Sequence, residues 1–353
     1  MRDARRPARV RFAGPRRKSA TKRPAHAGRF ALQTALAIVF ITSLAGRPVR
    51  ADDPASPPWQ LYRDSNPFVS ASGLPFAPPA VAADRWRVDI MLEASNTELG
   101  FDRRSESLLY DAEIHAERIA ISRGIGEHAI VRATFGGEQF GSGFLDGFIR
   151  DFHRTFGFTN GDRGHLGTDG HTIIYTDANG RGVVLDRNLS AAAPLLLDAA
   201  WRMSGDGHEW LYGATVKVPT SHASPLVDDR AVDLSVWAAV QSTAAEARIP
   251  WGARVGVMQR GDTQLLPQRA NDQVPFADAV IGYRLLPSWD VAAQYQWHGA
   301  LYDSDIPLLE SAGNLTLSTA WHAHAGWTLR AGLVEDLPSR HAQDVTFFVG
   351  LTL

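Results

Sequence analysis

The residue types with the widest chemical use are sparse in this sequence. It has no cysteine, which excludes disulfides, thiol nucleophiles and cysteine-ligated metals. His322 and His324 share one face of an alternating segment, and His153 and His165 lie in a long loop, but neither pair has a third ligand close in sequence. The spaced Ser, His and Asn groups of a barrel hydrolase are also missing. We therefore expect no metal site, no cofactor and no enzymatic activity.

Charged residues that alternate with apolar ones form a second group. If the apolar phase faces lipid, the charged phase must face inward, because a charge facing lipid at mid-depth costs a few kcal/mol. The inward charges either line water or pair across a filled lumen, and both interpretations stay open. The predicted lumen-lining residues are Asp89, Glu93, Asp111, Glu113, Glu117, Arg132, Arg202, Lys217, Arg254, Arg284 and Arg330.

The elements that must position these charges are strands with a period of two residues. Trp86, Val88, Ile90, Leu92 and Ala94 alternate with polar neighbours, which predicts a strand with one apolar face. Each such segment reaches about nine to eleven residues, the length that crosses a bilayer when tilted. The period recurs in segments that begin near Leu108, Ala129, Leu195, Trp210, Val232, Trp251, Ala277, Trp289, Leu315, Trp327 and Val345, which gives twelve strands.

The same rule predicts which face of the second strand is in contact with lipid. Leu108, Tyr110, Ala112, Ile114 and Ala116 are its apolar set, so we expect them to face lipid. The acidic residues between them are then expected to face the lumen.

Aromatic residues and loop lengths favour a membrane barrel over a soluble sandwich. Tryptophans in the outward phase fall at one end of the strands, as an aromatic girdle at a membrane surface requires. Links at that end are short, whereas links at the other end, such as 219–230, 261–274 and 299–312, are long and polar. The predicted girdle is Trp86, Trp201, Trp210, Trp251, Trp289, Trp321 and Trp327. We predict an all-β fold, a transmembrane antiparallel up-and-down β-barrel of about twelve strands.

The first 85 residues divide into a leader and a proline-rich segment. Residues 1–51 carry 13 Lys and Arg with one acid, followed by an apolar run and a small-x-small pattern ending at Ala51, which predicts a signal peptide cleaved near there. Residues 52–85 hold seven prolines, which exclude a helix or a central strand. This segment is either a plug in the barrel mouth or a flexible periplasmic lead.

The longest loop, 136–193, has the one helical pattern of the chain. Leu145, Phe148, Ile149, Phe152 and Phe156 form an apolar stripe, which predicts an amphipathic helix. The helix either packs on the loop hairpin and the rim, or its apolar face captures an apolar solute or caps the pore. A hairpin is predicted at Asn179-Gly180. Its arms are short, so we place it above the membrane; if it spanned the membrane, the barrel would have fourteen strands.

Several short motifs resemble those of the bacterial outer-membrane family catalogued as domain of unknown function 3187. They are the Arg63-Asp64-x-Asn66-Pro67-Phe68 run with Gly73-Leu74-Pro75, the run from Leu145 to Gly157, Val216-Lys217-Val218-Pro219-Thr220, and Glu335-Asp336 with Asp344-Val345. The resemblance covers most of the mature chain. It implies an outer-membrane barrel and brings no assigned activity. The chain departs from the usual aromatic terminus of such barrels by ending in Leu353.

Together these features predict a monomer in the outer membrane of a Gram-negative cell. Its expected partners are outer-membrane lipid, lipopolysaccharide and the barrel-assembly machinery, with no nucleic acid. We expect it to pass or take up a small or apolar solute. The alternative is a structural or adhesive surface barrel with a closed lumen.

Overall fold

The computed structural model describes residues 57–143, 145, 147, 151, 171–243, 248–323, 326–337 and 341–353. The chain divides into two units, Met1–Arg47 and Pro48–Leu353, and every described residue belongs to the second. The predicted signal peptide, and most of the predicted loop helix, lie outside the described residues. None of the described helices is long and apolar enough to cross a membrane.

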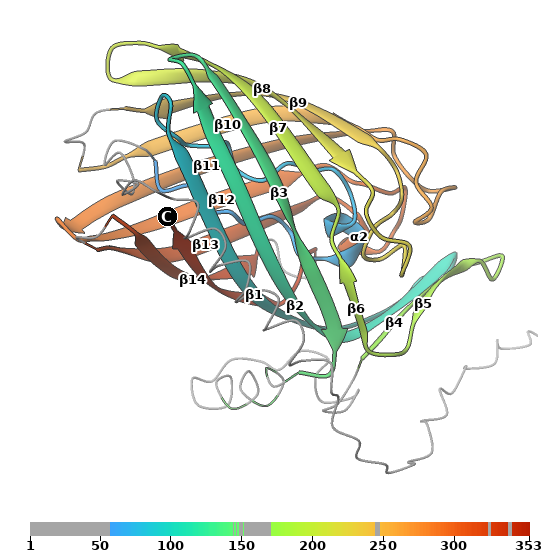
Figure 1. Ribbon diagram of the computed structural model, residues 1–353. Helices are drawn as coiled ribbons and strands as arrows, with labels where there is room; N and C mark the ends of the chain where they lie inside the picture. Colours follow the sequence, from blue (N-terminus) through green and yellow to red (C-terminus); the bar gives the residue numbers. More distant parts are fainter. Residues whose placement is uncertain are drawn as a thin grey trace, which may run out of the picture. The chain divides into compact units, whose positions relative to one another are not determined.

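Twelve antiparallel strands form a closed ring, as predicted (Figure 1). Each strand pairs with the next strand of the ring along the chain, and the first strand pairs with the last over Asp89↔Thr352 to Asn96↔Val345. The ring strands are β1 (Trp86–Asp102), β2 (Glu106–Ile125), β3 (Ala129–Gly141), β7 (Leu195–Ser204), β8 (His208–Val218), β9 (Asp233–Ser242), β10 (Trp251–Gln259), β11 (Gln273–Leu286), β12 (Trp289–His298), β13 (Ala312–His322), β14 (Thr328–Asp336) and β15 (Val345–Thr352).

Three short strands extend the sheet beyond this ring. β4 (Thr172–Asp177) pairs with the first residues of β2, and β5 (Gly182–Leu185) pairs with β4, forming a hairpin that projects from one end of the barrel (Figure 1). β6 (Leu189–Ala192) pairs with the last part of β3. Gly180 occupies the hairpin turn with φ +75°, a conformation that glycine adopts without steric cost. The hairpin therefore does not join the ring, and the fourteen-strand alternative is wrong.

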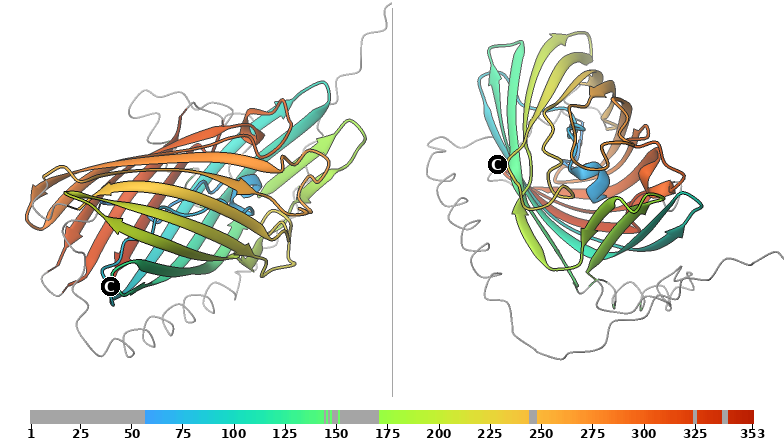
Figure 2. Two further views of the ribbon diagram at one scale, coloured as in Figure 1. Left: turned by 90° about the horizontal axis from the view of Figure 1, so that it is seen from above. Right: turned by 90° about the vertical axis from the view of Figure 1, so that its right-hand side faces the viewer.

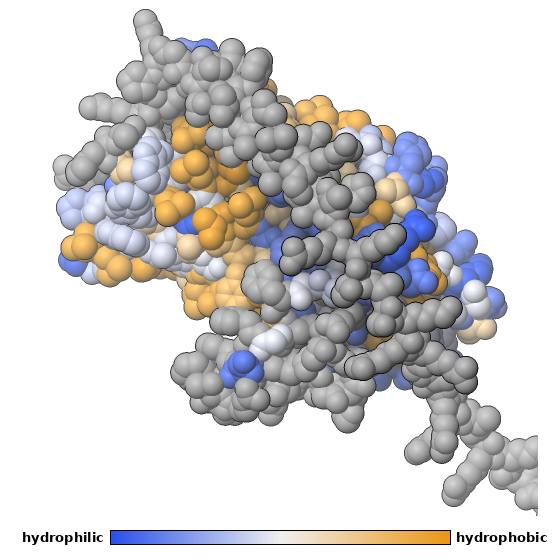
Figure 3. Space-filling view, turned by 60° about the horizontal axis from the view of Figure 1, so that its bottom comes forward, coloured by the Kyte–Doolittle hydropathy of each residue, from blue (hydrophilic) through white to orange (hydrophobic). Residues whose placement is uncertain are grey.

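The outward faces of the ring strands are apolar and exposed. Val255 on β10 is 62% exposed and Ile281 on β11 is 54% exposed, whereas Arg254 between the outward positions of β10 is 2% exposed. Figure 3 shows apolar residues gathered over the barrel wall and hydrophilic residues at the end where β4 and β5 project. This is the distribution that a lipid-facing wall requires.

The predicted aromatic residues lie at one end of the ring, which we call the tryptophan rim. Trp289 pairs directly with Trp321, and Trp201 pairs with Tyr212. Exposure is 55% for Trp86, 53% for Trp201, 42% for Trp210 and Trp251, and 41% for Trp289. Trp321 packs edge-on against Trp327, with ring centroids 5.1 Å apart. The opposite end, from which segments 219–232, 260–272 and 299–311 extend, is called the loop rim.

The predicted phase of β2 is wrong by one residue. Arg123 lies opposite Trp86 and Glu117 lies opposite Leu92, and both of these β1 residues are exposed on the outside. Glu117 therefore lies on the outer face. Asp111 and Glu113, at even spacing from Glu117, share that face and do not line the lumen.

Apolar residues of β2 face inward because the lumen beside them is itself apolar. Tyr110 and Leu108 are 0% and 2% exposed and belong to a buried cluster that includes Phe68. On the outer face, Glu113 accepts a hydrogen bond from the Leu145 backbone at 2.7 Å, and Leu145 packs against Val345. Leu145 thus lies against the outside of the barrel.

Residues 57–85, here called the lumen segment, run inside the ring (Figure 2). Their short helix α2 (Pro67–Ser70) is fully buried, and the residues on either side, from 57 to 79, are buried too. A second short helix, η1 (Pro307–Leu309), lies in the 299–311 segment and covers the tip of the lumen segment. The core of this barrel is therefore the packing between its wall and a segment of its own chain.

Candidate functional site: the contact between the lumen segment and the wall

The lumen segment has an outgoing leg (57–66), a tip formed by α2, and a return leg (71–85). The outgoing leg starts near the tryptophan rim, where Trp59 Nε1 donates to Gln241 Oε1 at 2.8 Å, and Gln241 pairs with Gly252 beside Trp251. The tip lies at the loop rim, where Tyr302 OH donates to the Phe68 carbonyl at 2.9 Å. The return leg leads back to β1, which begins at the tryptophan rim.

The outgoing leg follows β12 in a fixed register. Three inward side chains of β12, spaced two residues apart, each bond to one residue of the leg. The three partners on the leg are also spaced two residues apart, and each lies 234 positions earlier in the chain than the β12 residue it contacts. An extended chain has this two-residue repeat, so the two segments run side by side in the same direction. The contacts are Gln60 N to Gln294 Oε1 (2.9 Å), Gln296 Nε2 to the Tyr62 carbonyl (3.0 Å), and His298 Nε2 to Asp64 Oδ2 (3.2 Å).

At the tip, Asn66 connects the helix cap to the loop rim. Its Oδ1 accepts from the Phe68 backbone N–H at 3.1 Å, which is an N-terminal cap, and its Nδ2 donates to the Leu308 carbonyl at 2.8 Å. Tyr302, which bonds the same turn, is buried, and this burial raises the pKa of its phenol to about 12. It therefore stays a neutral donor at physiological pH.

Arg63 ties the two legs to each other. Its guanidinium donates to the carbonyls of Ser70, Ser72 (2.9 Å) and Leu74 (3.0 Å), and it lies 5.0 Å from the centroid of the Phe76 ring. The tip and both legs are consequently held as one folded unit.

The return leg is held by arginines of the wall through its backbone carbonyls. Pro75, Pro78 and Pro79 lack an N–H, so this leg is a poor partner for a sheet ladder and its carbonyls need other donors. The contacts are Arg254 to the Pro75 (3.2 Å) and Phe76 (2.6 Å) carbonyls, Arg132 to Ala77 (2.8 Å), Arg87 to Ala80 (3.1 Å), and Arg202 to Val81. We call these four residues the arginine track.

Each arginine of the track is also paired with a carboxylate of the wall. The carboxylate neutralises the charge and fixes the guanidinium plane, while remaining N–H groups point to the return leg. Because buried charges are costly without partners, these pairs let the wall carry arginines inside the barrel. The pairs are Arg254 with Asp278, Arg132 with Asp198 (2.8 Å), Arg87 with Asp89 (2.9 Å), and Arg202 with Glu209 (3.1 Å).

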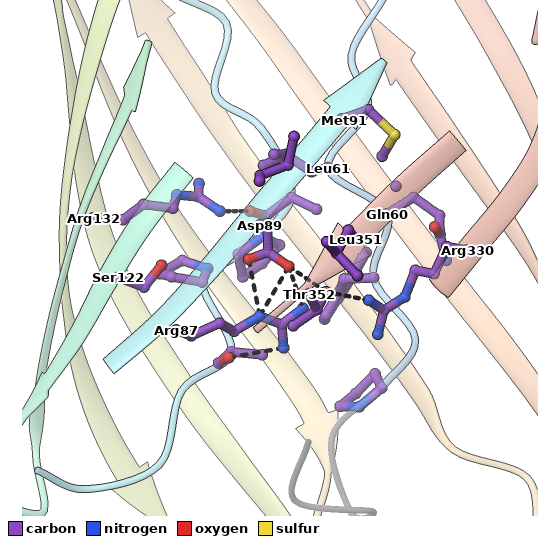
Figure 4. A pocket seen from close by; sticks show the side chains of 18 residues that line it. Gln60, Leu61, Arg87, Asp89, Met91, Ser122, Arg132, Arg330, Leu351 and Thr352 are labelled. Carbon is purple, nitrogen blue, oxygen red and sulfur yellow. Dashed lines mark hydrogen bonds and ion pairs between the residues drawn. The ribbon is translucent and has the colours of Figure 1, made fainter. Parts of the chain in front are cut away.

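A cavity remains between the two legs and the wall near the tryptophan rim (Figure 4). Its volume is about 30 Å³, room for very few water molecules, and it opens to solvent. Asp89 of β1 accepts from Thr352 of β15, and Arg330 of β14 donates to the same Thr352 hydroxyl. The first of these bonds crosses the seam between β1 and β15 that closes the barrel. The lumen segment thus leaves a small gap against the wall at this end of the barrel.

At the loop rim, a buried cluster of charges surrounds the start of the return leg. Gly73 donates its N–H to Asp233 Oδ2 at 2.7 Å, and its carbonyl accepts from Ser235 Oγ at 3.1 Å. Lys217, fully buried, is ion-paired with Asp229, which also pairs with Arg260 at 3.1 Å. Segments 219–232 and 260–272 are thereby drawn over the tip.

The predicted lumen-lining residues divide into three groups. Most of them face the lumen. Among these, Arg132, Arg202 and Arg254 belong to the arginine track, and Asp89 is paired with its fourth member, Arg87. Asp111, Glu113 and Glu117 lie on the outer face. Glu93 is buried in the lumen near Arg118, which pairs with Glu138 at 2.6 Å. Arg284 lies 3.5 Å from Asp290 near the tryptophan rim.

Sequence reasoning missed the residues that hold the outgoing leg. Gln294, Gln296 and His298 occupy successive inward positions of β12, and a run of neutral polar side chains at that spacing is the signal that could have identified them. Arg63 and Asp64 lay inside a recognised motif without an assigned role. Their contacts are far away in sequence, so no local pattern showed them.

Among the described residues, no group of three or more histidine and acidic side chains could hold a metal ion. His322 donates or accepts through Nε2 with Asp290 (2.8 Å) and through Nδ1 with the Thr328 hydroxyl (3.0 Å). Its ring is thus part of a local bonding network beneath the tryptophan rim.

A closed antiparallel ring with an apolar exposed wall and an aromatic rim defines a transmembrane β-barrel of the outer-membrane type. The chain belongs to the family described as Protein of unknown function (DUF3187), whose model matches residues 37–353. No curated protein matches the sequence.

Solved structures with a similar fold are outer-membrane barrels. An outer membrane channel from Pseudomonas putida F1 has a TM-score of 0.51 at 10% identity, over 77% of this chain and 96% of that chain. The NanC porin has a TM-score of 0.42 at 10% identity, covering 75% and 98%. The toluene transporter TodX of P. putida has a TM-score of 0.40 at 10% identity, covering 82% and 92%. At such identities the likeness concerns the fold.

Proposed function

We propose that this protein is a gated passage for small solutes across the outer membrane, and that the lumen segment is its gate. The observation that carries the proposal is the content of the barrel. Two legs of chain lie side by side within the ring, so the wall encloses more space than its own side chains fill. Displacement of this segment would leave a water-filled path lined by charged and amide side chains.

The contacts of the gate are reversible in kind. Hydrogen bonds, ion pairs and apolar packing hold it, and among the described residues its one covalent link to the wall is the chain connection from the return leg to β1. The arginines that bind backbone carbonyls of residues 75–81 keep their carboxylate partners when the leg moves away, so opening leaves none of these arginines as an isolated buried charge. A plug built in this way leaves the wall intact when it departs.

The same proposal includes the location and orientation of the barrel. It is a monomer of the outer membrane, exported with a signal peptide cleaved near Ala51 and inserted by the barrel-assembly machinery. The tryptophan rim faces the periplasm because the lumen segment leads into the barrel there, and the loop rim faces lipopolysaccharide.

A second candidate function is a structural or adhesive barrel whose lumen stays closed. The buried charge cluster around Lys217 favours it, since that cluster draws two loop-rim segments over the tip. In this case, the segments beyond the loop rim would bind a partner and permeability would play no part. One experiment separates the two candidates.

A disulfide can lock the outgoing leg to the wall, because the chain has no cysteine of its own. A Cβ placed on Gly282 of β11 would lie 2.7 Å from Cγ of Pro58, close to the separation between Cβ and the partner sulfur in a disulfide. The variant P58C/G282C should therefore form the bond under oxidation. The single variants P58C and G282C are the matched controls.

The measurement is conductance in planar bilayers, recorded on the same P58C/G282C protein before and after a reductant is added. A passage gated by the lumen segment conducts when reduced and loses its conductance when oxidised, while both single variants ignore the redox change. A protein that conducts in neither state, and admits no solute into liposomes, contradicts the proposal and supports the closed barrel.

A further inference from the structure

The polar contacts between the wall and the lumen segment go largely to the segment's main chain. Along the return leg, every contact of the arginine track goes to a backbone carbonyl. On the outgoing leg, Gln294 accepts the N–H of residue 60, and Gln296 donates to the carbonyl of residue 62. Main-chain groups are common to all peptides, so these contacts do not depend on the side chains of the segment.

The spacing of the wall groups also matches a peptide. Gln294 and Gln296 are two residues apart on β12, and they bond residues two apart on the leg, one through a donor and one through an acceptor. This two-residue repeat of alternating N–H and C=O belongs to an extended polypeptide. A sugar offers hydroxyl groups without this order.

The proline-rich return leg meets a different part of the same wall. Its carbonyls at residues 75–77 lie against Arg254 and Arg132, whose guanidinium groups stay oriented by Asp278 and Asp198. When the leg is displaced, these N–H groups lose their acceptors but keep their positions. The opened wall would present fixed donors to the next carbonyl-rich chain.

From these contacts, and on the basis of the gating function proposed above, we propose that the opened lumen is a binding site for extended oligopeptides. The lumen segment occupies that site as an internal substitute. The arginine track binds the peptide's carbonyls, and the amide pair of β12 binds its N–H and C=O groups. Peptides are therefore the solute class that the passage carries.

The test measures binding of a fluorescent decapeptide with the sequence of residues 72–81 to full-length P58C/G282C by fluorescence anisotropy. A tethered segment competes at an effective concentration near the millimolar range, so the titration extends to low millimolar peptide. We expect binding to the reduced protein and at least tenfold weaker binding to the oxidised protein, in which the segment is locked in place. A scrambled peptide of the same composition should bind within about threefold of the original, because the contacts involve the main chain.

A second pair of variants tests the track itself. R254Q/D278N, added to the same background, removes a buried ion pair as a unit and should weaken peptide binding about tenfold, as expected for losing the charged donor of two carbonyls. R181Q/D177N removes an ion pair from the β4–β5 hairpin and is the control. A polyethylene glycol of equal length should not compete with the peptide.

The outcomes separate this inference from the gate. Absence of peptide binding to the reduced protein, or binding that is insensitive to both the lock and R254Q/D278N, overturns the peptide site even where the reduced protein conducts. Peptide binding that follows both changes supports the site even where conductance is absent, and that result would refute the gated passage alone.

Discussion

Replacement of Gly73 by alanine tests how firmly the lumen segment is held. A Cβ at this position would lie 2.5 Å from the Cβ of Asp233 and 3.0 Å from that of Lys217. Carbon atoms without a bond between them approach to about 3.5 Å, so the start of the return leg must retreat by about 1 Å. Asp233 and Lys217 belong to strands of the wall and have little room to move.

The retreat breaks both wall contacts of Gly73. Its 2.7 Å bond to the Asp233 carboxylate would lengthen beyond hydrogen-bonding range, as would the 3.1 Å bond from Ser235. A bond to a charged group contributes about 1.5–3 kcal/mol and a neutral bond about 1 kcal/mol. The closed state should therefore lose about 3 kcal/mol relative to the open state, which raises the open-to-closed ratio roughly a hundredfold.

Single-channel recording measures this ratio directly as open probability. Gly100 of β1 provides the control, because an added Cβ there meets no atom within 4 Å, and G100A should behave as the unmodified protein. A G73A protein that keeps its heat-modifiable barrel on gels but shows the open probability of G100A would refute the idea that the wall contacts of Gly73 hold the gate.

Three further predictions concern the barrel and its rims. The K217M variant should lose about 3–5 kcal/mol of unfolding free energy, because it leaves buried carboxylates without their cation, and the loss should appear as a lower temperature of barrel unfolding. The K217M/D229N variant should recover part of that loss. Equal stability of these two variants and the unmodified protein would contradict the prediction. The folded protein should migrate differently on a denaturing gel before and after boiling, and identical migration would argue against a membrane barrel. Asp177 accepts hydrogen bonds from the backbone N–H groups of Arg181 and Asn179, and these bonds hold its pKa at about 2. The β4–β5 hairpin should therefore keep its NMR signature down to about pH 3 and lose it as the pH falls below 3. Loss of the hairpin's NMR signature near pH 4, or the same low-pH transition in the D177N variant, would contradict this last prediction.

The strands of the ring could be predicted because lipid constrains every outward side chain. On β10, Trp251, Val255 and Val257 face outward with 42%, 62% and 38% exposure, and nothing but the membrane favours apolar groups there. The same constraint places the tryptophans at one rim. Eleven of the twelve strand phases follow from it without reference to any contact inside the barrel.

The position of the lumen segment could not be predicted in this way. Its prolines exclude a long helix and a central strand, although the short helix α2 begins at Pro67, and they agree equally with a plug and with a flexible lead. Phe68, Leu74 and Phe76, with 0%, 6% and 1% exposure, gave a hint through their apolar character alone. The register that places them depends on β12, 234 residues further along the chain, and no local pattern carries that information.

The phase of β2 was predicted wrongly because the sequence did not show that the lumen segment fills the barrel. Alternation shows that one face of a strand is apolar, and assigning that face to lipid assumes that the inside is polar. Here, the inside beside β2 contains α2 and the loop-rim segments, so Tyr110 and Leu108 find an apolar core there. The outside of the same stretch carries Glu113, which binds the Leu145 backbone. The rule that the apolar face of a barrel strand faces lipid is therefore reversed along the part of a strand that a plug contacts. A strand with an acidic outward face and an apolar inward face is itself evidence of a plug.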